Sequence, residues 1–360
     1  MSTTRLRSLS YSPLDVPLRE PFGIATGAQT VAANVLVQVE LEDGTVGLGE
    51  AAPFPAVSGE TQAAVLAALP SAERALQGHD AARYRPACAA VREALSHLPS
   101  ALCAVEMALL DALGKSHGVS LWSFFGGAET TLLTDITIPT GDVAHARAAA
   151  RRAQEANFSA LKIKVGGAAL DEDAERVRAV HATAPNAELI LDANAALSAT
   201  DALWLLTELG PARSRVVLYE QPTARDDLDG LAQVERDGRV PVAADESARS
   251  ASEVARIARL GAASVINVKT AKTGLVEAWE MIATARSHGL QLMIGGMVET
   301  ELSMSTSACL AAGIGGFRFV DLDTPLFMGP RPLCGGFVQH GPRLDVSAID
   351  AGHGVEVTWP

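Results

Sequence analysis

The chain has 360 residues, of which 48% are hydrophobic, and its formal net charge is −13 at pH 7. This length provides ample core for one large domain or two of ordinary size. The acidic charge argues against nucleic acid or an anionic membrane surface as a partner, because both would need clustered Lys and Arg. The first residues lack the apolar stretch of a signal peptide, and no segment approaches the roughly 18 consecutive apolar residues of a membrane span, so we expect a cytoplasmic protein.

Residues 1–128 predict a separate α+β domain. The stretch "VLVQVELEDGTVGLGEA" (35–51) reads as an alternating strand, an Asp-Gly turn and a second strand, which is typical of a β-hairpin. Helical patterns follow, most clearly in "ALCAVEMALLDALGKSHG" (101–118). The Gly-rich stretch "PFGIATGAQT" (21–30) indicates either a mobile loop or a plain connector.

Residues 129–325 repeat one theme, a short β-branched run followed by a helical stretch with apolar residues three or four apart. Eight near-equal units favour a closed β/α barrel over a doubly wound open sheet. The tail, residues 326–360, is too irregular to extend the barrel, and we expect it to pack back on the first domain. The eight runs are "LLTDITI", "ALKIKV", "ELILD", "VVLYE", "PVAAD", "SVINVK", "LQLMIG" and "FRFVD".

Ionisable residues end five successive runs at spacings of 28, 28, 25 and 24 residues: Lys164, Asp192, Glu220, Asp245 and Lys269. In a barrel these C-terminal strand ends converge on one mouth, where such residues usually act in catalysis. Lys162 lies two residues before Lys164, so both side chains point to the same face of their strand. An isolated pair of lysines on one face would suit a solvated edge strand. Here the neighbouring strands end in carboxylates, so the two ammonium groups are expected to lie in a functional site.

The three carboxylates, Asp192, Glu220 and Asp245, predict a metal site. On adjacent strands they would repel one another unless a hard divalent cation neutralised them, and an all-oxygen ligand set suits Mg²⁺ or Mn²⁺. Asn194 in "DAN" and Glu246 in "DES" sit beside these ligands. They either bind outer-shell water or orient the lysines, or they serve only in packing.

The lysines complete a site for proton transfer. A metal held by the carboxylates can bind a substrate carboxylate, and a neighbouring ammonium stabilises the charge that develops when the adjacent carbon loses a proton. Free lysine has a pKa of about 10.4, so a lysine that acts as a base needs a lowered pKa. A nearby metal ion and a second ammonium group would both lower it. Of Lys162 and Lys164, one can bind charge while the other moves the proton. Lys269 approaches from the opposite side of the barrel, and a base on each face of a planar enolate is what racemisation requires.

The motifs "KIK", "DAN", "EQP", "ADES" and "NVK", in this order and at barrel spacing, resemble the enolase superfamily, muconate-lactonizing subgroup, over nearly the whole chain. The resemblance implies an α/β fold, a modified (β/α)7β TIM-type barrel whose mouth is covered by the N-terminal α+β capping domain, and a Mg²⁺ ion that stabilises an enediolate. It also implies roles for particular residues. The metal ligands would be Asp192, Glu220 and Asp245, the acid/base pair Lys164 and Lys269, and the carboxylate-stabilising neighbour Lys162.

Within that subgroup, "FVDLDTPL" (319–326) resembles dipeptide epimerases, whose D-x-D at the eighth strand end holds the free α-ammonium group of the substrate. The resemblance therefore implies an isomerase that inverts the α-carbon of the C-terminal residue of a dipeptide, with Asp321 and Asp323 binding the ammonium group. The alternatives are an N-acylamino acid racemase, an o-succinylbenzoate synthase or a muconate-type cycloisomerase, none of which has such an ammonium to bind. The two aspartates could also simply end a strand.

The side-chain preference rests on the capping loop. Ala-Glu epimerases supply an arginine from this loop, whereas residues 21–34 here contain no Lys or Arg and Thr26 stands at that place. We therefore predict an apolar side chain on the epimerised residue, because a buried, unpaired carboxylate would be costly. Glu50 and Glu299 would instead favour a cationic side chain if they faced the pocket. The other residues that we predict to bind the substrate are Phe22, Ile24, Gly296 and Met297. The sequence leaves the oligomeric state open between a monomer and a homo-oligomer.

Overall fold

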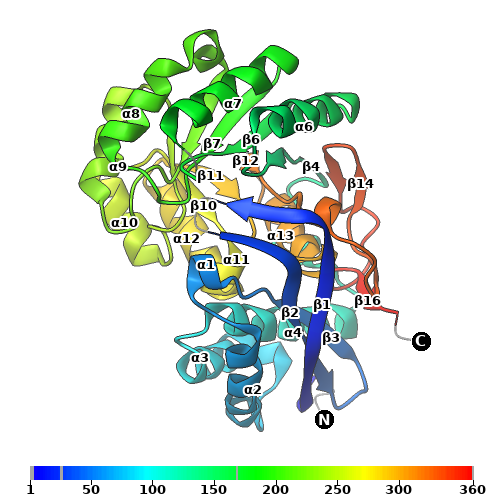
Figure 1. Ribbon diagram of the computed structural model, residues 1–360. Helices are drawn as coiled ribbons and strands as arrows, with labels where there is room; N and C mark the ends of the chain where they lie inside the picture. Colours follow the sequence, from blue (N-terminus) through cyan, green and yellow to red (C-terminus); the bar gives the residue numbers. More distant parts are fainter. Residues whose placement is uncertain (1–3, 25–26, 168, 359–360) are drawn as a thin grey trace.

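The computed structural model describes residues 4–24, 27–167 and 169–358. Thr26, which we predicted to bind the substrate, lies outside this part of the chain. The N-terminal part of the chain lies below a curled sheet of parallel strands, and the ends of β1 and β2 reach up towards that sheet (Figure 1). The predicted fold class, a β/α barrel with an N-terminal α+β capping domain, is confirmed.

The capping domain packs helices on an antiparallel sheet of three strands in the order β1-β2-β3. The predicted hairpin is present, because Val35 pairs with Ala51 and Glu40 with Val46 across the turn. At Gly49 an added Cβ atom would lie 1.9 Å from the carbonyl oxygen of Ala104, so glycine is required where α4 crosses the strand. The elements are β1 (Leu6–Ile24), β2 (Gly27–Leu41), β3 (Val46–Ala51), α1 (Pro55–Ser58), α2 (Gln62–Leu76), η1 (Ala81–Arg83), α3 (Tyr84–Ala94), α4 (Pro99–His117) and α5 (Leu121–Phe124).

The Gly-rich stretch that we predicted as a loop belongs mostly to the sheet. Phe22 pairs with Gln29 and Ile24 pairs with Gly27, so the described residues of this stretch lie in β1 and β2. The physical reason is cross-strand pairing along two unusually long strands, which overrides the weak local preference of glycine.

The barrel contains an eight-stranded sheet in the order β12-β11-β10-β9-β8-β7-β6-β5. Its first and last strands meet at one backbone hydrogen bond, from Asp135 N–H to the Val320 carbonyl oxygen (2.9 Å). Parallel strands are covered on both faces of the sheet, which explains why the sequences of these strands are almost continuously apolar. The strands are β5 (Ile136–Ile138), β6 (Ala160–Lys164), β7 (Glu188–Asp192), β8 (Val216–Glu220), β9 (Val242–Ala244), β10 (Val265–Val268), β11 (Gln291–Ile294) and β12 (Phe317–Val320).

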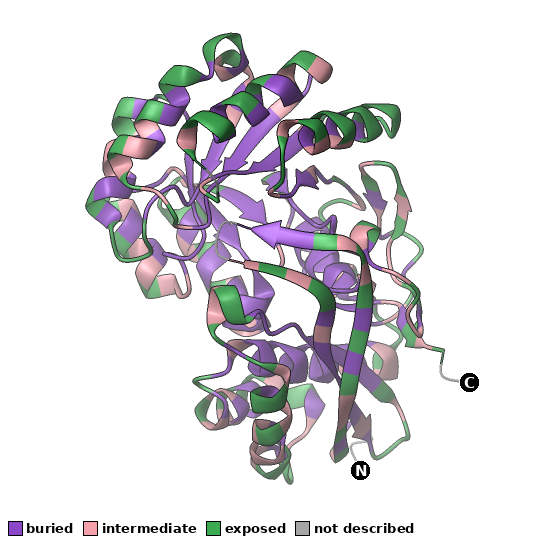
Figure 2. Ribbon diagram, viewed as in Figure 1, coloured by how far each residue is buried: buried purple, intermediate pink, exposed green. Residues whose placement is uncertain are grey.

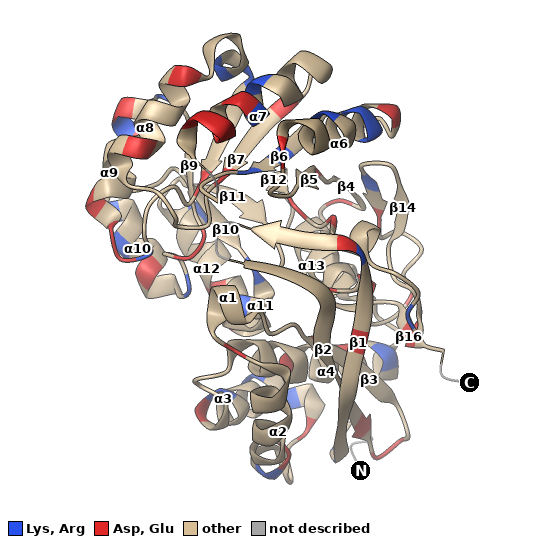
Figure 3. Cartoon of the chain, in the orientation of Figure 1, with Lys and Arg blue, Asp and Glu red and all other residues tan. Residues whose placement is uncertain are grey.

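Helices surround the barrel, with buried inner faces and exposed outer faces (Figure 2). Many charged residues outside the barrel lie on the outer helices, for example on α6 and α7 (Figure 3). The floor inside the barrel is apolar and contains Ile190, Leu218 and Phe319. The helices are α6 (Val143–Glu155), α7 (Leu170–Thr183), α8 (Ala199–Glu208), η2 (Gly210–Arg215), α9 (Leu228–Gly238), α10 (Ala251–Leu260), α11 (Thr270–Thr273), α12 (Leu275–Ser287), α13 (Glu301–Ile314) and η3 (Thr324–Phe327).

The tail contacts the capping domain at several points. His353 N–H donates to Asp111 Oδ1 (2.9 Å), and a ring nitrogen of His353 bonds to the Leu48 carbonyl oxygen (3.0 Å). The predicted first barrel run, "LLTDITI", is divided between two sheets, because its first half forms β4 and pairs with the tail. The elements concerned are β4 (Thr131–Leu133), β13 (Leu333–Gly335), β14 (Val338–His340), β15 (Arg343–Asp345) and β16 (Val355–Val357). In the described part of the chain, no helix combines the length and the apolar character needed to cross a membrane.

Candidate active site

The predicted strand-end residues meet at the mouth of the barrel. In the sheet Lys164 pairs with Asp192, and Asp192 pairs with Glu220, so the three residues lie at the same level on neighbouring strands. Asp245 and Lys269 directly follow β9 and β10. All five residues are at most 5% exposed, so their charges interact with little screening by water.

Lys162 lies at the centre of the carboxylates. Its Nζ atom is 2.9 Å from Asp192 Oδ2, 2.8 Å from Glu220 Oε2 and 2.6 Å from Asp321 Oδ2. Three anionic partners around one buried ammonium explain why two lysines can occupy the same face of β6 without destabilising it.

Lys164 and Lys269 approach from opposite sides. Lys164 Nζ is 2.6 Å from Asp192 Oδ2, whereas Lys269 Nζ is 2.7 Å from Asp245 Oδ2. Their strands, β6 and β10, are separated by three strands in the eight-stranded sheet. Both side chains line one cavity, into which they project from different sides.

The lysine pKa values differ from the sequence-based expectation of lowered values. Burial lowers the pKa of Lys269, but the carboxylates of Asp245 and Glu220 raise it more, so the net shift is upward. The pKa of Lys162 is likewise raised, because Asp192, Asp321 and Glu220 outweigh the effect of burial. The expectation of a lowered pKa rested on a bound metal and a second ammonium, whereas these upward shifts come from direct ion pairs with the carboxylates.

Two loop residues hold the carboxylates in place. Gln221, directly after Glu220, accepts hydrogen bonds at Oε1 from the backbone N–H groups of Asp245 (2.8 Å) and Ser247 (3.1 Å). This contact ties the end of β8 to the end of β9. Asn194 adopts a left-handed conformation with φ of 44°, and its N–H donates to Asp192 Oδ1 (3.0 Å). The "EQP" and "DAN" motifs therefore have a local structural basis, since asparagine tolerates this conformation better than most residues.

The two residues predicted to lie beside the ligands are buried, and each has one oxygen without a partner. Asn194 Oδ1 and Glu246 Oε2 have no hydrogen-bonding partner among the described residues. Burial, together with the charges of Asp245 and Asp192, raises the pKa of Glu246 to about 8. These oxygens are free to accept from water or to contact a cation.

Lys272 and Asn267 were missed by sequence reasoning. Lys272 Nζ donates to the Asp245 carbonyl oxygen (2.6 Å) and contacts Asp245 Oδ1, while Asn267 Nδ2 donates to Glu220 Oε1 (2.8 Å). Asn267 precedes Lys269 by two residues, so the alternation of strand side chains could have placed it on the inner face. Lys272 lies on α11, and no strand pattern points to it.

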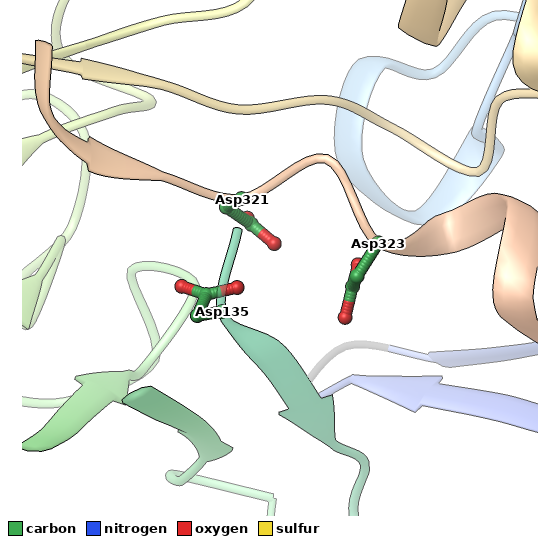
Figure 4. Close-up of side chains that lie close together, drawn as sticks. All are labelled: Asp135, Asp321 and Asp323. Carbon is green, nitrogen blue, oxygen red and sulfur yellow. The ribbon is translucent and has the colours of Figure 1, made fainter. Parts of the chain in front are cut away.

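A second group of carboxyls lies between β12 and β5. One ligand oxygen each of Asp135, Asp321 and Asp323 lies within 4.8 Å of the others, and Figure 4 shows the three side chains close together. Asp323 Oδ2 accepts from Thr137 N–H (2.6 Å). Burial and the Asp321 charge raise the pKa of Asp323 to about 7. Sequence reasoning missed Asp135, although an aspartate inside the apolar run "LLTDITI" was a signal.

The cavity wall opposite the charges is apolar. The cavity itself is small, about 30 Å³. The predicted residues Gly296 and Met297 line this cavity, and its apolar side chains are Phe22, Ile24, Phe54, Val57, Met297 and Val298.

Glu50 and Glu299 lie behind the cavity wall. Glu50 accepts from the backbone N–H groups of Thr300 and Ser303 (3.0 and 3.2 Å) and so caps the N-terminus of α13, where a negative charge is favourable. Neither oxygen of Glu299 has a hydrogen-bonding partner within the described residues. Burial and the charge of Glu50 raise the pKa of Glu299 to about 8. Neither glutamate is among the residues that line the cavity.

Comparison with known proteins gives matches over most of the chain. Residues 9–126 match the mandelate racemase/muconate lactonizing enzyme N-terminal domain, and residues 144–360 match the enolase C-terminal domain-like family. An aromatic dipeptide epimerase from Herpetosiphon aurantiacus is 49% identical over 354 residues, which are 98% of this chain and 99% of the relative.

Solved structures are similarly close. A crystal structure from Sorangium cellulosum, described as a mandelate racemase/muconate lactonizing enzyme, is 54% identical with a TM-score of 0.95 and covers 99% of this chain and 100% of that one. The dipeptide epimerase of Enterococcus faecalis, solved with Mg and the dipeptide L-Leu-L-Tyr, is 29% identical with a TM-score of 0.93 and covers 98% of this chain and 99% of that one.

Proposed function

The chain belongs to the mandelate racemase/muconate lactonizing enzyme family, and from this membership we propose that it is a metal-dependent dipeptide epimerase. The observation that carries the proposal is a single cavity with Lys164 and Lys269 on opposite sides and Asp321 and Asp323 in its wall. Two lysines can serve the two faces of a carbon acid, and the aspartates can hold an ammonium group. The dipeptide epimerases among its relatives support the same activity.

The geometry assigns a task to each side chain. Asp321 and Asp323 would accept hydrogen bonds from the substrate α-ammonium group, which places the α-carbon of the second residue between the lysines. Lys164 or Lys269 would remove the α-proton to its Nζ atom, and the lysine on the other side would deliver a proton to the opposite face. Lys162 would contribute a fixed positive charge near the substrate carboxylate.

A divalent metal fits the carboxylates at β7, β8 and β9. Asp192, Glu220 and Asp245 form an all-oxygen set, and the unpartnered Glu246 Oε2 lies beside it. Such a set suits Mg²⁺. When bound, Mg²⁺ would supply positive charge that stabilises the enolate formed from the substrate.

The second group, Asp135, Asp321 and Asp323, is the one trio in the described residues whose ligand atoms lie within 4.8 Å of one another. We nevertheless assign Mg²⁺ to the first group. Lys162 already pairs with Asp321 at 2.6 Å, and Asp135 does not line the cavity. Two members of this second group, Asp321 and Asp323, line the cavity and suffice to accept from an ammonium group.

The same site argues against an N-acylamino acid racemase or a cycloisomerase. Asp321 and Asp323 both line the cavity, and a substrate with a neutral acyl group would bring no positive charge to balance them. Such a substrate would forgo a charge-assisted hydrogen bond, which is worth about 1.5–3 kcal/mol. The apolar wall with Phe22, Ile24 and Phe54 favours an apolar or aromatic side chain on the epimerised residue.

The test is exchange of solvent deuterium into the α-carbon of a dipeptide library, followed by NMR with and without Mg²⁺. We expect exchange and inversion of the second residue, dependent on Mg²⁺ or Mn²⁺ and strongest for apolar dipeptides. N-acetylated dipeptides serve as the matched comparison. Full activity after chelation, or a preference for N-acylated amino acids, would contradict the proposal.

A further inference from the structure

Asp135 has no function in the site described so far. Asp135 is 2% exposed, and neither of its carboxyl oxygens has a hydrogen-bonding partner among the described residues. Its backbone N–H donates to the Val320 carbonyl oxygen (2.9 Å), which holds Asp135 close to Asp321, the next residue after Val320. A buried carboxyl group held in this way without a partner is costly, which suggests that the partner is supplied by the site itself.

The partners of the neighbouring aspartates leave a buried acceptor open on Asp323. Asp321 Oδ2 is taken by Lys162 Nζ (2.6 Å), and Asp323 Oδ2 by Thr137 N–H (2.6 Å). Asp323 Oδ1 is buried and has no partner within the described part of the chain. One oxygen of Asp135 lies within 4.8 Å of an oxygen of Asp321 and of an oxygen of Asp323, so the three carboxyl groups are close neighbours (Figure 4).

The charges decide which group carries the proton. Three buried carboxyls this close disfavour full ionisation, because among the described residues only Lys162 lies within ion-pair distance of one of them. Burial raises the pKa of Asp135 well above its usual value, and the charges of Asp321 and Asp323 raise it further. Asp135 is therefore the group best suited to be a neutral hydrogen-bond donor.

Asp135 stands behind the substrate cavity and not in its wall. Asp321 and Asp323 line that cavity, whereas Asp135 lines a separate cavity of about 400 Å³ near the barrel floor, with Glu188 and Arg318. Its action on a substrate would consequently pass through the two other aspartates.

We propose that Asp135 is a positioning residue for the ammonium-binding pair, and that its carboxyl O–H donates to Asp323 Oδ1 and fixes that carboxylate towards the substrate. This inference rests on the proposed function, which assigns the substrate ammonium group to Asp321 and Asp323. A neutral donor leaves the negative charge of the pair available to the substrate, whereas a third anion would repel its neighbours. Removal of the donor should weaken the binding of a free dipeptide and leave proton transfer nearly intact.

The experiment compares Asp135→Asn, which keeps a donor of the same size, with Asp135→Ala, which removes it. We expect Asp135→Asn to stay within about threefold of the parent, and Asp135→Ala to raise KM for Ala-Leu about tenfold or more with kcat within about threefold. Binding of N-acetyl-Ala-Leu should change in neither variant. Glu106→Gln is the matched control, because Glu106 is also buried with an unpartnered oxygen but lies on α4, outside the cavity.

Infrared difference spectra test the protonation directly and do not need activity. The carbonyl band of a protonated carboxylic acid should be lost in Asp135→Asn relative to the parent, even if Asp135→Ala fails to fold. An unchanged band, equal KM in all variants, or equal losses for free and acetylated dipeptides would overturn the inference. Weaker Mg²⁺ binding by Asp135→Asn in calorimetry would also overturn it by identifying the trio as a metal site. If the parent protein does not act on dipeptides, the proposed function fails, while the infrared result still judges Asp135.

Discussion

Two groups of carboxyls at the barrel mouth differ in how their charge is balanced. The group at β7 to β9, Asp192, Glu220 and Asp245, is surrounded by ammonium groups, with Lys164 on one side and Lys269 on the other. In the described part of the chain, the group between β12 and β5 has one ammonium within ion-pair distance, Lys162, which contacts Asp321 there and is shared with Asp192 and Glu220 of the first group.

The difference indicates which cation each group of carboxyls is suited to bind. Lys164 and Lys269 now pair with carboxylate oxygens that a divalent metal would bind. Binding of the metal would therefore release the two lysines for proton transfer. The second group places two carboxyl groups, Asp321 and Asp323, in the cavity wall. It is suited to a cation that arrives with the substrate, an ammonium group.

The largest effect should come from breaking the first group. Asp192→Asn should lower the rate of exchange by roughly 10³-fold or more, since charge stabilisation by a metal is worth several kcal/mol. Calorimetry should show weaker Mg²⁺ binding. Glu188→Gln, at the other end of the same strand β7, is the control and should behave as the parent protein. Undiminished Mg²⁺ binding in Asp192→Asn would move the metal to another group.

The two lysines of the first group should be separable by the epimer on which they act. Lys164→Ala or Lys269→Ala should block inversion, with a loss of roughly 10²- to 10⁴-fold for an acid/base group. Each variant should retain deuterium exchange with only one of the two epimers, measured by NMR from each pure epimer. Lys115→Ala, in the capping domain, is the control. Exchange with both epimers in both variants would exclude the two-base arrangement.

The sequence predicted the first group better than the second. Strand periodicity and equal spacing were sufficient to place Lys164, Asp192 and Glu220 at one level, because parallel strands in register bring their ends together. Asp135 could not be placed, because it precedes a strand of three residues and its neighbours come from the far end of the chain. Contacts of this kind depend on closure of the barrel between β5 and β12.

Three other features were also beyond local reasoning. Lys272 reaches Asp245 from a short helix, α11, and the capping role of Glu50 at α13 joins two domains. The raised pKa of Lys269 depends on distances to Asp245 and Glu220 that only the folded chain fixes. Sequence patterns thus gave the residue types of the site, while their pairing required the fold.

The second group should be broken selectively by Asp323→Asn. A charge-assisted hydrogen bond is worth about 1.5–3 kcal/mol, so kcat/KM for a free dipeptide should fall roughly 10- to 100-fold. The N-acetylated dipeptide should be affected much less, because it lacks the ammonium group. Asp321→Asn should cost more than Asp323→Asn, since it also removes a partner of Lys162. Equal losses for free and acetylated substrates would show that the pair does not bind the ammonium group.

The smallest expected effect concerns the apolar wall that faces both groups. No Lys or Arg of the described capping residues lines the cavity, and the barrel lysines that do are paired with carboxylates, so a glutamate side chain would be buried without a counter-ion. We expect kcat/KM for Ala-Phe and Ala-Leu to exceed that for Ala-Glu by about tenfold or more. Ala-Lys should also be disfavoured, because Glu50 is satisfied by α13 and does not face the cavity.

Phe54→Ala should then lower kcat/KM for Ala-Phe roughly 10-fold and that for Ala-Ala by less than about threefold, since a lost aromatic contact costs about 0.5–1.5 kcal/mol beyond its buried area. Leu133→Ala, which is 64% exposed and does not line the cavity, is the control. A preference for Ala-Glu would reveal an anion-binding group in the wall, and a preference for Ala-Lys would return Glu50 or Glu299 to the specificity site.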